Sequence, residues 1–209
     1  MLDVGVAQIL AALNLTALGA GFVLGHALDR APRGRVAIVA RTDPGRGTEI
    51  LWIVGALVAA FWPAGVLLDP RYAYDWPAAP GFPGSSALQV AGFAAALGGG
   101  LLFFGAARTL GRQMTPKIRI QEGHRLIQEG PYRFVRHPAY TAIVTGAAGL
   151  TALFLSLPLA LLTAVLLGLA VYRARLEEQL LASEKGFGPV YLEYVSRTGR
   201  FLPRLRPKR

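Results

Sequence analysis

Residues 139–172, AYTAIVTGAAGLTALFLSLPLALLTAVLLGLAVY, decide the fold, because they contain no Asp, Glu, Lys or Arg. At about 1.5 Å per residue, roughly 20 helical residues cross a hydrocarbon core of about 30 Å, so this stretch is long enough for two spans. We expect the first span to cover Ala139–Leu157, with a tight turn at Pro158. The second should run from Leu159 past Tyr172 into a polar helical extension.

Three further blocks lack charged residues in the same way: Val4–Leu28, Ile50–Leu68 and Leu88–Ala107. The first is too long for a signal peptide and has neither a basic leader nor a small-residue cleavage site, so we expect it to be a span. The 209 residues, 53% of them hydrophobic, therefore predict an all-α integral membrane protein with about five transmembrane helices. Residues 1–107 should form three N-terminal helices, and residues 108–209 the functional core.

The basic residues predict the orientation. Five lie in segment 29–49, seven in 108–138 and nine from Arg173 onward, whereas loop 69–87 holds only Arg71, so 21 of 22 lie on one side. The positive-inside rule then places the N-terminus outside and the C-terminus in the cytoplasm. The charge suits anionic membrane lipids, and we expect no nucleic-acid partner because no basic module with interleaved aromatic residues is present. The absence of cysteine excludes disulfides and thiolate chemistry.

The predicted hairpin brings polar residues together. His137 lies about 20 residues before the turn and Glu178 lies 20 residues after Pro158, so antiparallel helices should place both at one membrane depth, at the cytoplasmic interface. The alternative is a solvated basic collar, in which Arg173–Glu177 and Arg175–Glu178 are ordinary pairs on a helix surface.

The stretch 130–140, GPYRFVRHPAY, favours a binding site. Its first two residues break the preceding segment, and Pro138 is well placed as the first residue of a helix. The free N–H groups of a helix start can bind a carboxylate or phosphate. Tyr132, Phe134 and Tyr140 can offer aromatic faces to a flat ring or a cation.

This stretch, preceded by His124-Arg125-Leu126-Ile127, resembles the cofactor loop of isoprenylcysteine carboxyl methyltransferases and related small membrane methyltransferases. The later motifs also match in order and spacing: Arg175-Leu176-Glu177-Glu178, Phe187-Gly188, Tyr191, Tyr194, Arg200 and Leu202-Pro203. The resemblance covers residues 117–203. It implies that S-adenosylmethionine binds in a cytoplasm-facing pocket formed by the loop and the C-terminal helix, and leaves as S-adenosylhomocysteine. It also implies a tunnel open to the bilayer for a lipophilic small-molecule or lipidated acceptor, and no metal.

The resemblance assigns roles residue by residue. Arg175 and Glu178 would be catalytic, Arg175 and Arg200 would bind the acceptor, and Glu178 is favoured over Glu177 as the carboxylate that contacts the cofactor. The remaining cofactor-binding residues would be His124, Arg125, Leu126, Ile127, Tyr132, His137, Pro138, Ala139 and Tyr140.

The expected reaction is methylation of an isoprenylcysteine-like carboxylate, which is already ionised at neutral pH. The alternatives are N-methylation of a phosphatidylethanolamine-type lipid, an NADPH-dependent membrane reductase and a non-catalytic membrane scaffold. The Ala-, Gly- and Arg-rich composition is typical of prokaryotes. We therefore expect an inner-membrane protein whose active site faces the cytoplasm.

Overall fold

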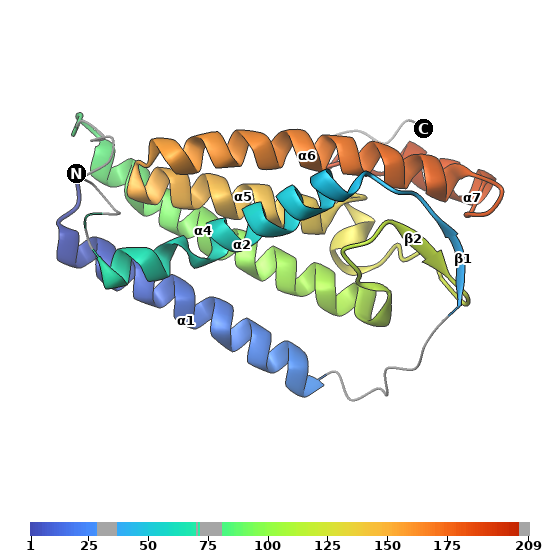
Figure 1. Cartoon of the computed structure of the whole chain (residues 1–209), viewed down its shortest axis with the longest axis horizontal. Helices are drawn as coiled ribbons and strands as arrows, with labels where there is room; N and C mark the ends of the chain where they lie inside the picture. Colours follow the sequence, from blue (N-terminus) through green and yellow to red (C-terminus); the bar gives the residue numbers. More distant parts are fainter. Residues whose placement is uncertain (29–36, 70, 72–80, 205–209) are drawn as a thin grey trace.

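The computed structural model describes residues 1–28, 37–69, 71 and 81–204 (Figure 1). Its long helices are α1 (Val4–Leu28), α2 (Arg46–Leu68), α4 (Ser85–Leu110), α5 (Pro138–Phe154) and α6 (Leu157–Ala182). The shorter elements are α7 (Pro189–Arg197), the 3-10 turns η1 (Gly111–Gln113) and η2 (Gly130–Arg133), and the antiparallel strands β1 (Ile38–Arg41) and β2 (Arg119–Gln121). The prediction of a helical protein is confirmed, with the small sheet as an addition that the sequence analysis did not contain.

Four helices, α1, α2, α4 and α6, are long and apolar enough to cross a bilayer, which indicates an integral membrane protein. The fifth predicted span, α5, has 17 residues and reaches about 25 Å, slightly less than a typical hydrocarbon core. The orientation across the membrane stays a prediction, and Arg30, Arg33 and Arg35, which contribute to it, lie outside the described residues.

The turn between α5 and α6 comes earlier than predicted. Helix α5 ends at Phe154, Leu155 adopts a left-handed conformation with φ 47°, and Ser156 caps α6 by accepting a hydrogen bond from the Leu159 N–H. The prediction of a turn at Pro158 is therefore wrong by about one helical turn. Proline fits the first turn of a helix because the N–H groups there have no partner within the helix, and Pro158 takes that place.

Glycines allow α4 and α5 to pack with their backbones in contact. A Cβ added at Gly99 would lie 2.7 Å from the backbone nitrogen of Gly146 and 2.8 Å from the carbonyl oxygen of Ala142. The same added atom at Gly98 would meet nothing within 4 Å. Close helix packing was predicted for Gly98–Gly100. Within this run, Gly99 is the residue whose missing side chain lets the two helix backbones touch.

We expect Gly99→Ala to lower the stability of the protein by about 1–3 kcal/mol, because the methyl group forces two helix backbones apart. Gly98→Ala is the matched control, since its methyl group enters open space. The measurement is thermal unfolding of both variants in the same detergent. Equal unfolding temperatures would show that this contact tolerates the added methyl group.

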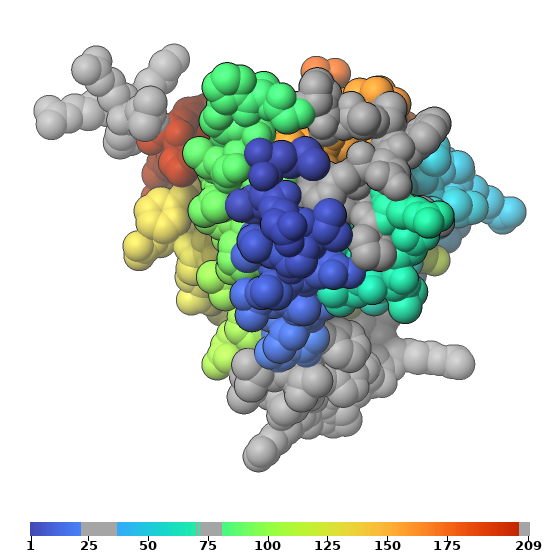
Figure 2. All heavy atoms as spheres, turned by 90° about the vertical axis from the view of Figure 1, so that its left-hand side faces the viewer, coloured from blue at the N-terminus to red at the C-terminus, as the bar shows by residue number. Residues whose placement is uncertain are grey.

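The two ends of the bundle are formed by different structural elements. The N-terminus and the α5–α6 turn lie at one end, while β1, β2, η2 and α7 gather at the other (Figure 1). Seen from the N-terminal end, α1 lies on the outside between α2 and α4 (Figure 2). The polar elements therefore meet around the C-terminal half of α6, where the sequence places the candidate site.

Candidate functional site

A cavity opens between the loops that follow α4, the C-terminal half of α6 and α7. Residues predicted for the cofactor line one side of it: His124, Arg125, Leu126, Ile127, Tyr132, His137, Ala139 and Tyr140. Glu177, Phe187, Tyr191 and Tyr194 line the other. The structure thus gathers both predicted strips around one space, and Pro138 is buried at the start of α5 beside it.

The strip that begins at His124 is held by a neighbouring amide. The Gln113 side chain accepts the Arg125 backbone N–H at 2.6 Å and donates to its carbonyl oxygen at 3.1 Å. The His124 ring packs edge-on against Phe187 with centroids 5.8 Å apart. These contacts fix the strip against the loop that follows α6.

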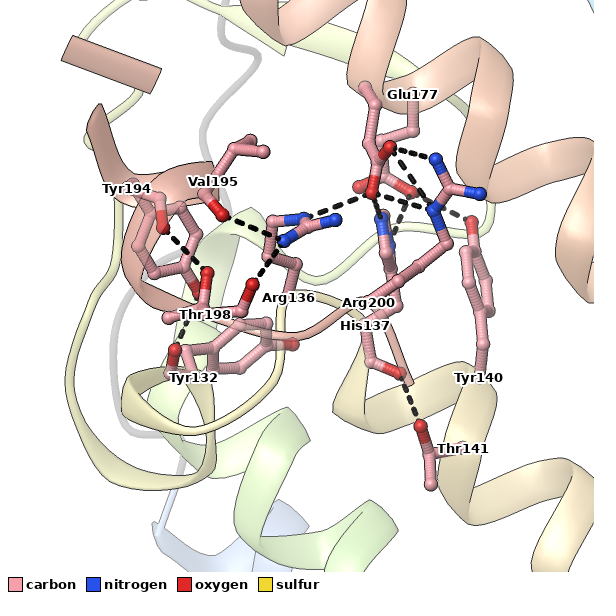
Figure 3. Close-up of polar contacts among 11 residues, drawn as sticks. Tyr132, Arg136, His137, Tyr140, Thr141, Glu177, Tyr194, Val195, Thr198 and Arg200 are labelled. Atoms are coloured by element: carbon pink, nitrogen blue, oxygen red, sulfur yellow. Dashed lines mark hydrogen bonds and ion pairs between the residues drawn. The ribbon is translucent and has the colours of Figure 1, made fainter. Parts of the chain in front are cut away.

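The predicted meeting of His137 and Glu178 is confirmed (Figure 3). Glu178 Oε1 lies 3.1 Å from His137 Nε2 and accepts the Arg136 Nε–H at 3.0 Å. Arg200 donates to both carboxylate oxygens, with Nη2 2.5 Å from Oε2. The Glu178 carboxylate is therefore surrounded by protein donors, and the residue does not line the cavity.

The segment that follows α7 is bound to the loop that precedes α5. The backbone N–H of Arg136 donates to the Gly199 carbonyl at 2.9 Å, and that of His137 donates to the Arg200 carbonyl at 3.1 Å. In return, the Gly199 N–H donates to the Phe134 carbonyl at 3.3 Å. The Glu178 carboxylate of α6 contacts both of these bonded segments: the loop before α5 through Arg136 and His137, and the segment after α7 through Arg200.

Glu177 is the carboxylate that faces the cavity. Its side chain is 35% exposed, it accepts the Tyr140 hydroxyl at 2.9 Å, and its Oε2 lies 3.7 Å from His137 Nδ1 (Figure 3). The sequence analysis favoured Glu178 over Glu177 for cofactor contact. In the structure Glu177 is the one of the two that a bound ligand can reach.

Sequence reasoning missed Arg173, which it treated as part of a surface pair. This side chain is 1% exposed and donates through Nη2 to the Pro116 carbonyl, and its Nε and Nη1 have no hydrogen-bond partner among the residues that the structure describes. Arg175, to which an acceptor role was assigned, is exposed on α6, and neither arginine lines the cavity. The signal that could have found Arg173 is its spacing of four residues before Glu177, which puts both on one helix face.

Burial sets the protonation of the groups around the cavity. It lowers the pKa of His124 below its usual value, against the opposing effect of the Glu177 charge, so this imidazole is neutral at neutral pH. Burial raises the pKa of Tyr194 to about 12 and also raises the pKa of Tyr132 and Tyr191. The tyrosines are therefore uncharged hydroxyls, and the Tyr191 hydroxyl is buried with no hydrogen-bond partner in the described part of the chain.

Known proteins are similar to the segment that carries most of this site. Residues 92–183 match the isoprenylcysteine carboxyl methyltransferase (ICMT) family model. A probable protein-S-isoprenylcysteine O-methyltransferase of Oryza sativa subsp. indica is 33% identical over 100 residues, 47% of this chain and 52% of that protein. Protein-S-isoprenylcysteine O-methyltransferase B of Arabidopsis thaliana is 30% identical over 97 residues, 46% of this chain and 49% of that protein.

A bacterial protein also matches. The cobalt-zinc-cadmium resistance protein CzcN of Cupriavidus metallidurans is 37% identical over 87 residues, 41% of this chain and 38% of that protein. The chain spans about half the length, or less, of the curated relatives it matches. The similarity of the chain to the isoprenylcysteine carboxyl methyltransferase family therefore rests on residues 92–183, which are less than half of its length.

Proposed function

We propose that the protein is an S-adenosylmethionine-dependent methyltransferase that methylates the carboxylate of a lipophilic acceptor. The match of residues 92–183 to the family model supports the reaction class. The observation that carries the choice of acceptor is Arg173, a buried guanidinium behind the cavity wall, one helical turn before Glu177. Among the described residues, two of its nitrogens, Nε and Nη1, have no hydrogen-bond partner.

The cavity has the chemistry that the methyl donor requires. S-adenosylmethionine carries an ammonium, a carboxylate and an adenosine, and Glu177 offers a counter-charge for the ammonium. Arg125, which also lines the cavity, can pair with the carboxylate, and aromatic rings on both sides can pack against adenine. The unpartnered Tyr191 hydroxyl can hydrogen-bond a polar group of the ligand. The residues present therefore fit this cofactor.

Arg173 fits an anionic acceptor. An arginine buried among apolar helices is costly unless its N–H groups are satisfied, and a carboxylate can accept a charge-assisted hydrogen bond from Nε or Nη1. When bound, S-adenosylmethionine supplies a methyl group on a positively charged sulfur, and an ionised carboxylate needs no base to accept it. The task of Arg173 is then to bind and orient the acceptor. An amine acceptor would leave the N–H groups at Nε and Nη1 unsatisfied.

Donor binding tests the first half of the proposal. In detergent, we expect S-adenosylmethionine to bind saturably and Glu177→Gln to weaken it about tenfold or more, since a charge-assisted hydrogen bond is lost. Glu184→Gln is the control, because this carboxylate is exposed and does not line the cavity. Absence of donor binding to the unmodified protein would refute the proposal.

The acceptor half is tested by radiolabelled methyl transfer. Small prenyl-thioether carboxylic acids and a total lipid extract serve as acceptors in parallel. We expect a base-labile methyl ester on the acids. Label found only in an ethanolamine headgroup would replace this acceptor with the phospholipid amine.

A further inference from the structure

Two opposite charges on α6 remain apart at a spacing that usually brings them together. Arg173 and Glu177 are four residues apart, so their side chains are neighbours on one helix face. Within the described part of the chain, no ion pair joins them directly. Arg173 donates to the Pro116 carbonyl and also interacts with the Tyr140 hydroxyl, which in turn donates to Glu177. The Tyr140 hydroxyl thus stands between the guanidinium and the carboxylate, and a direct Arg–Glu pair would neutralise both groups.

Trp52 of α2 contacts both Arg173 and Tyr140. The Arg173 Cζ lies 5.8 Å from the centroid of the Trp52 ring, within cation–π range. The Tyr140 ring meets the Trp52 ring edge-on, with centroids 5.2 Å apart and planes at 85°. Trp52 therefore packs against the guanidinium and against the tyrosine that holds Glu177.

The position of Trp52 is fixed by close packing of α2 on α6. The side chain is 5% exposed, and one turn later a Cβ added at Gly55 would lie 3.1 Å from Leu166 of α6. Helix α2 lies outside the segment that matches the family model, residues 92–183. The N-terminal half of the chain thus contributes a side chain that packs against Tyr140 in the cavity wall, beyond forming membrane helices.

We propose that Trp52 is a positioning residue, which keeps the Arg173 guanidinium on its ring face and away from Glu177. This inference rests on the proposed function. Glu177 then stays free for the ammonium of the methyl donor, and Arg173 stays free for the anionic group of the acceptor. Without the indole, the long arginine side chain can swing one turn along α6 and pair with Glu177, which blocks both binding groups together.

The test is a double-mutant cycle read by S-adenosylhomocysteine binding to the full chain in detergent. Trp52→Leu should weaken binding roughly 3- to 30-fold, because the released Arg173 neutralises Glu177. In an Arg173→Met background, the same Trp52→Leu change should alter binding by less than about twofold, since no cation remains to be released. Trp52→Phe keeps an aromatic face and should retain most of the affinity.

Comparing the effect of Trp52→Leu with and without Arg173 distinguishes a positioning role of Trp52 from ordinary packing. If Trp52→Leu weakens binding equally with and without Arg173, Trp52 is only a packing residue and the inference is wrong. Kinetics provide the second readout: Trp52→Leu should raise KM for donor and acceptor while kcat changes less. Failure of the proposed function is distinct, because the unmodified protein would then bind neither S-adenosylmethionine nor S-adenosylhomocysteine.

Discussion

Arg173→Met should lower kcat/KM for a lipophilic carboxylic acid by about a hundredfold or more, since a charge-assisted hydrogen bond to the acceptor is lost. Donor binding should persist, because Glu177 and the aromatic residues of the cavity are unchanged. The measurement combines methyl-transfer kinetics with titration of S-adenosylmethionine. A variant that loses donor affinity to the same extent as turnover would contradict this division of roles.

The same substitution should leave the stability of the fold unchanged or raise it. Two buried Arg173 nitrogens, Nε and Nη1, have no partner among the described residues, and an unbranched apolar side chain of similar length removes that cost. Loss of activity with an equal or higher unfolding temperature is the pattern expected of a binding residue. A fall in unfolding temperature would instead assign Arg173 a structural role.

Arg175→Met is the matched control, and it also tests the role assigned to Arg175 from the sequence. Arg175 is exposed, two residues further along the same helix. We expect its replacement to change acceptor kinetics by less than about threefold, as is usual for an isolated surface charge. If Arg175→Met causes the larger loss, the family-based assignment is right and the proposal for Arg173 is wrong.

The sequence alone did not indicate which of these two arginines is buried. Consecutive helical residues are rotated by about 100°, so Arg173 and Arg175 point in directions about 160° apart. Helix α6 is apolar on all sides along its membrane part, so its sequence gives no periodicity that marks the inward face. Which arginine is buried depends on the position of Trp52 and Pro116, which lie far away in the chain.

The sequence predicted correctly that the last two long helices run antiparallel. It did not predict where the turn between them lies or that two distant strands pair. The contact between His137 and Glu178 was predictable because two apolar stretches joined by a short turn must run antiparallel. The turn itself was misplaced because Leu155, a residue that rarely adopts a positive φ, does so here. Strands β1 and β2 were not predicted, since each is short and its partner lies about 80 residues away.

Glu178→Leu should destabilise the protein by about 3–5 kcal/mol, the usual effect of leaving buried ionic partners uncompensated. The Arg136 side chain is 7% exposed and that of Glu178 is 14% exposed, so solvent replaces the lost carboxylate poorly. His137 and Arg200 lose the same partner. The measurement is thermal unfolding in detergent, with Glu193→Gln as the control.

That control removes a carboxylate of the same chemistry from a different environment. Glu193 pairs with Arg197 at 3.2 Å, but their side chains are 68% and 58% exposed, so its loss should cost less than about 1 kcal/mol. Glu178→Leu should also expose the segment after α7 to trypsin at Arg200, because the carboxylate that binds this guanidinium to α6 is gone. If that segment stays protected and the unfolding temperature matches the control, its backbone bonds to the loop before α5 suffice, and Glu178 is free to serve the cofactor directly.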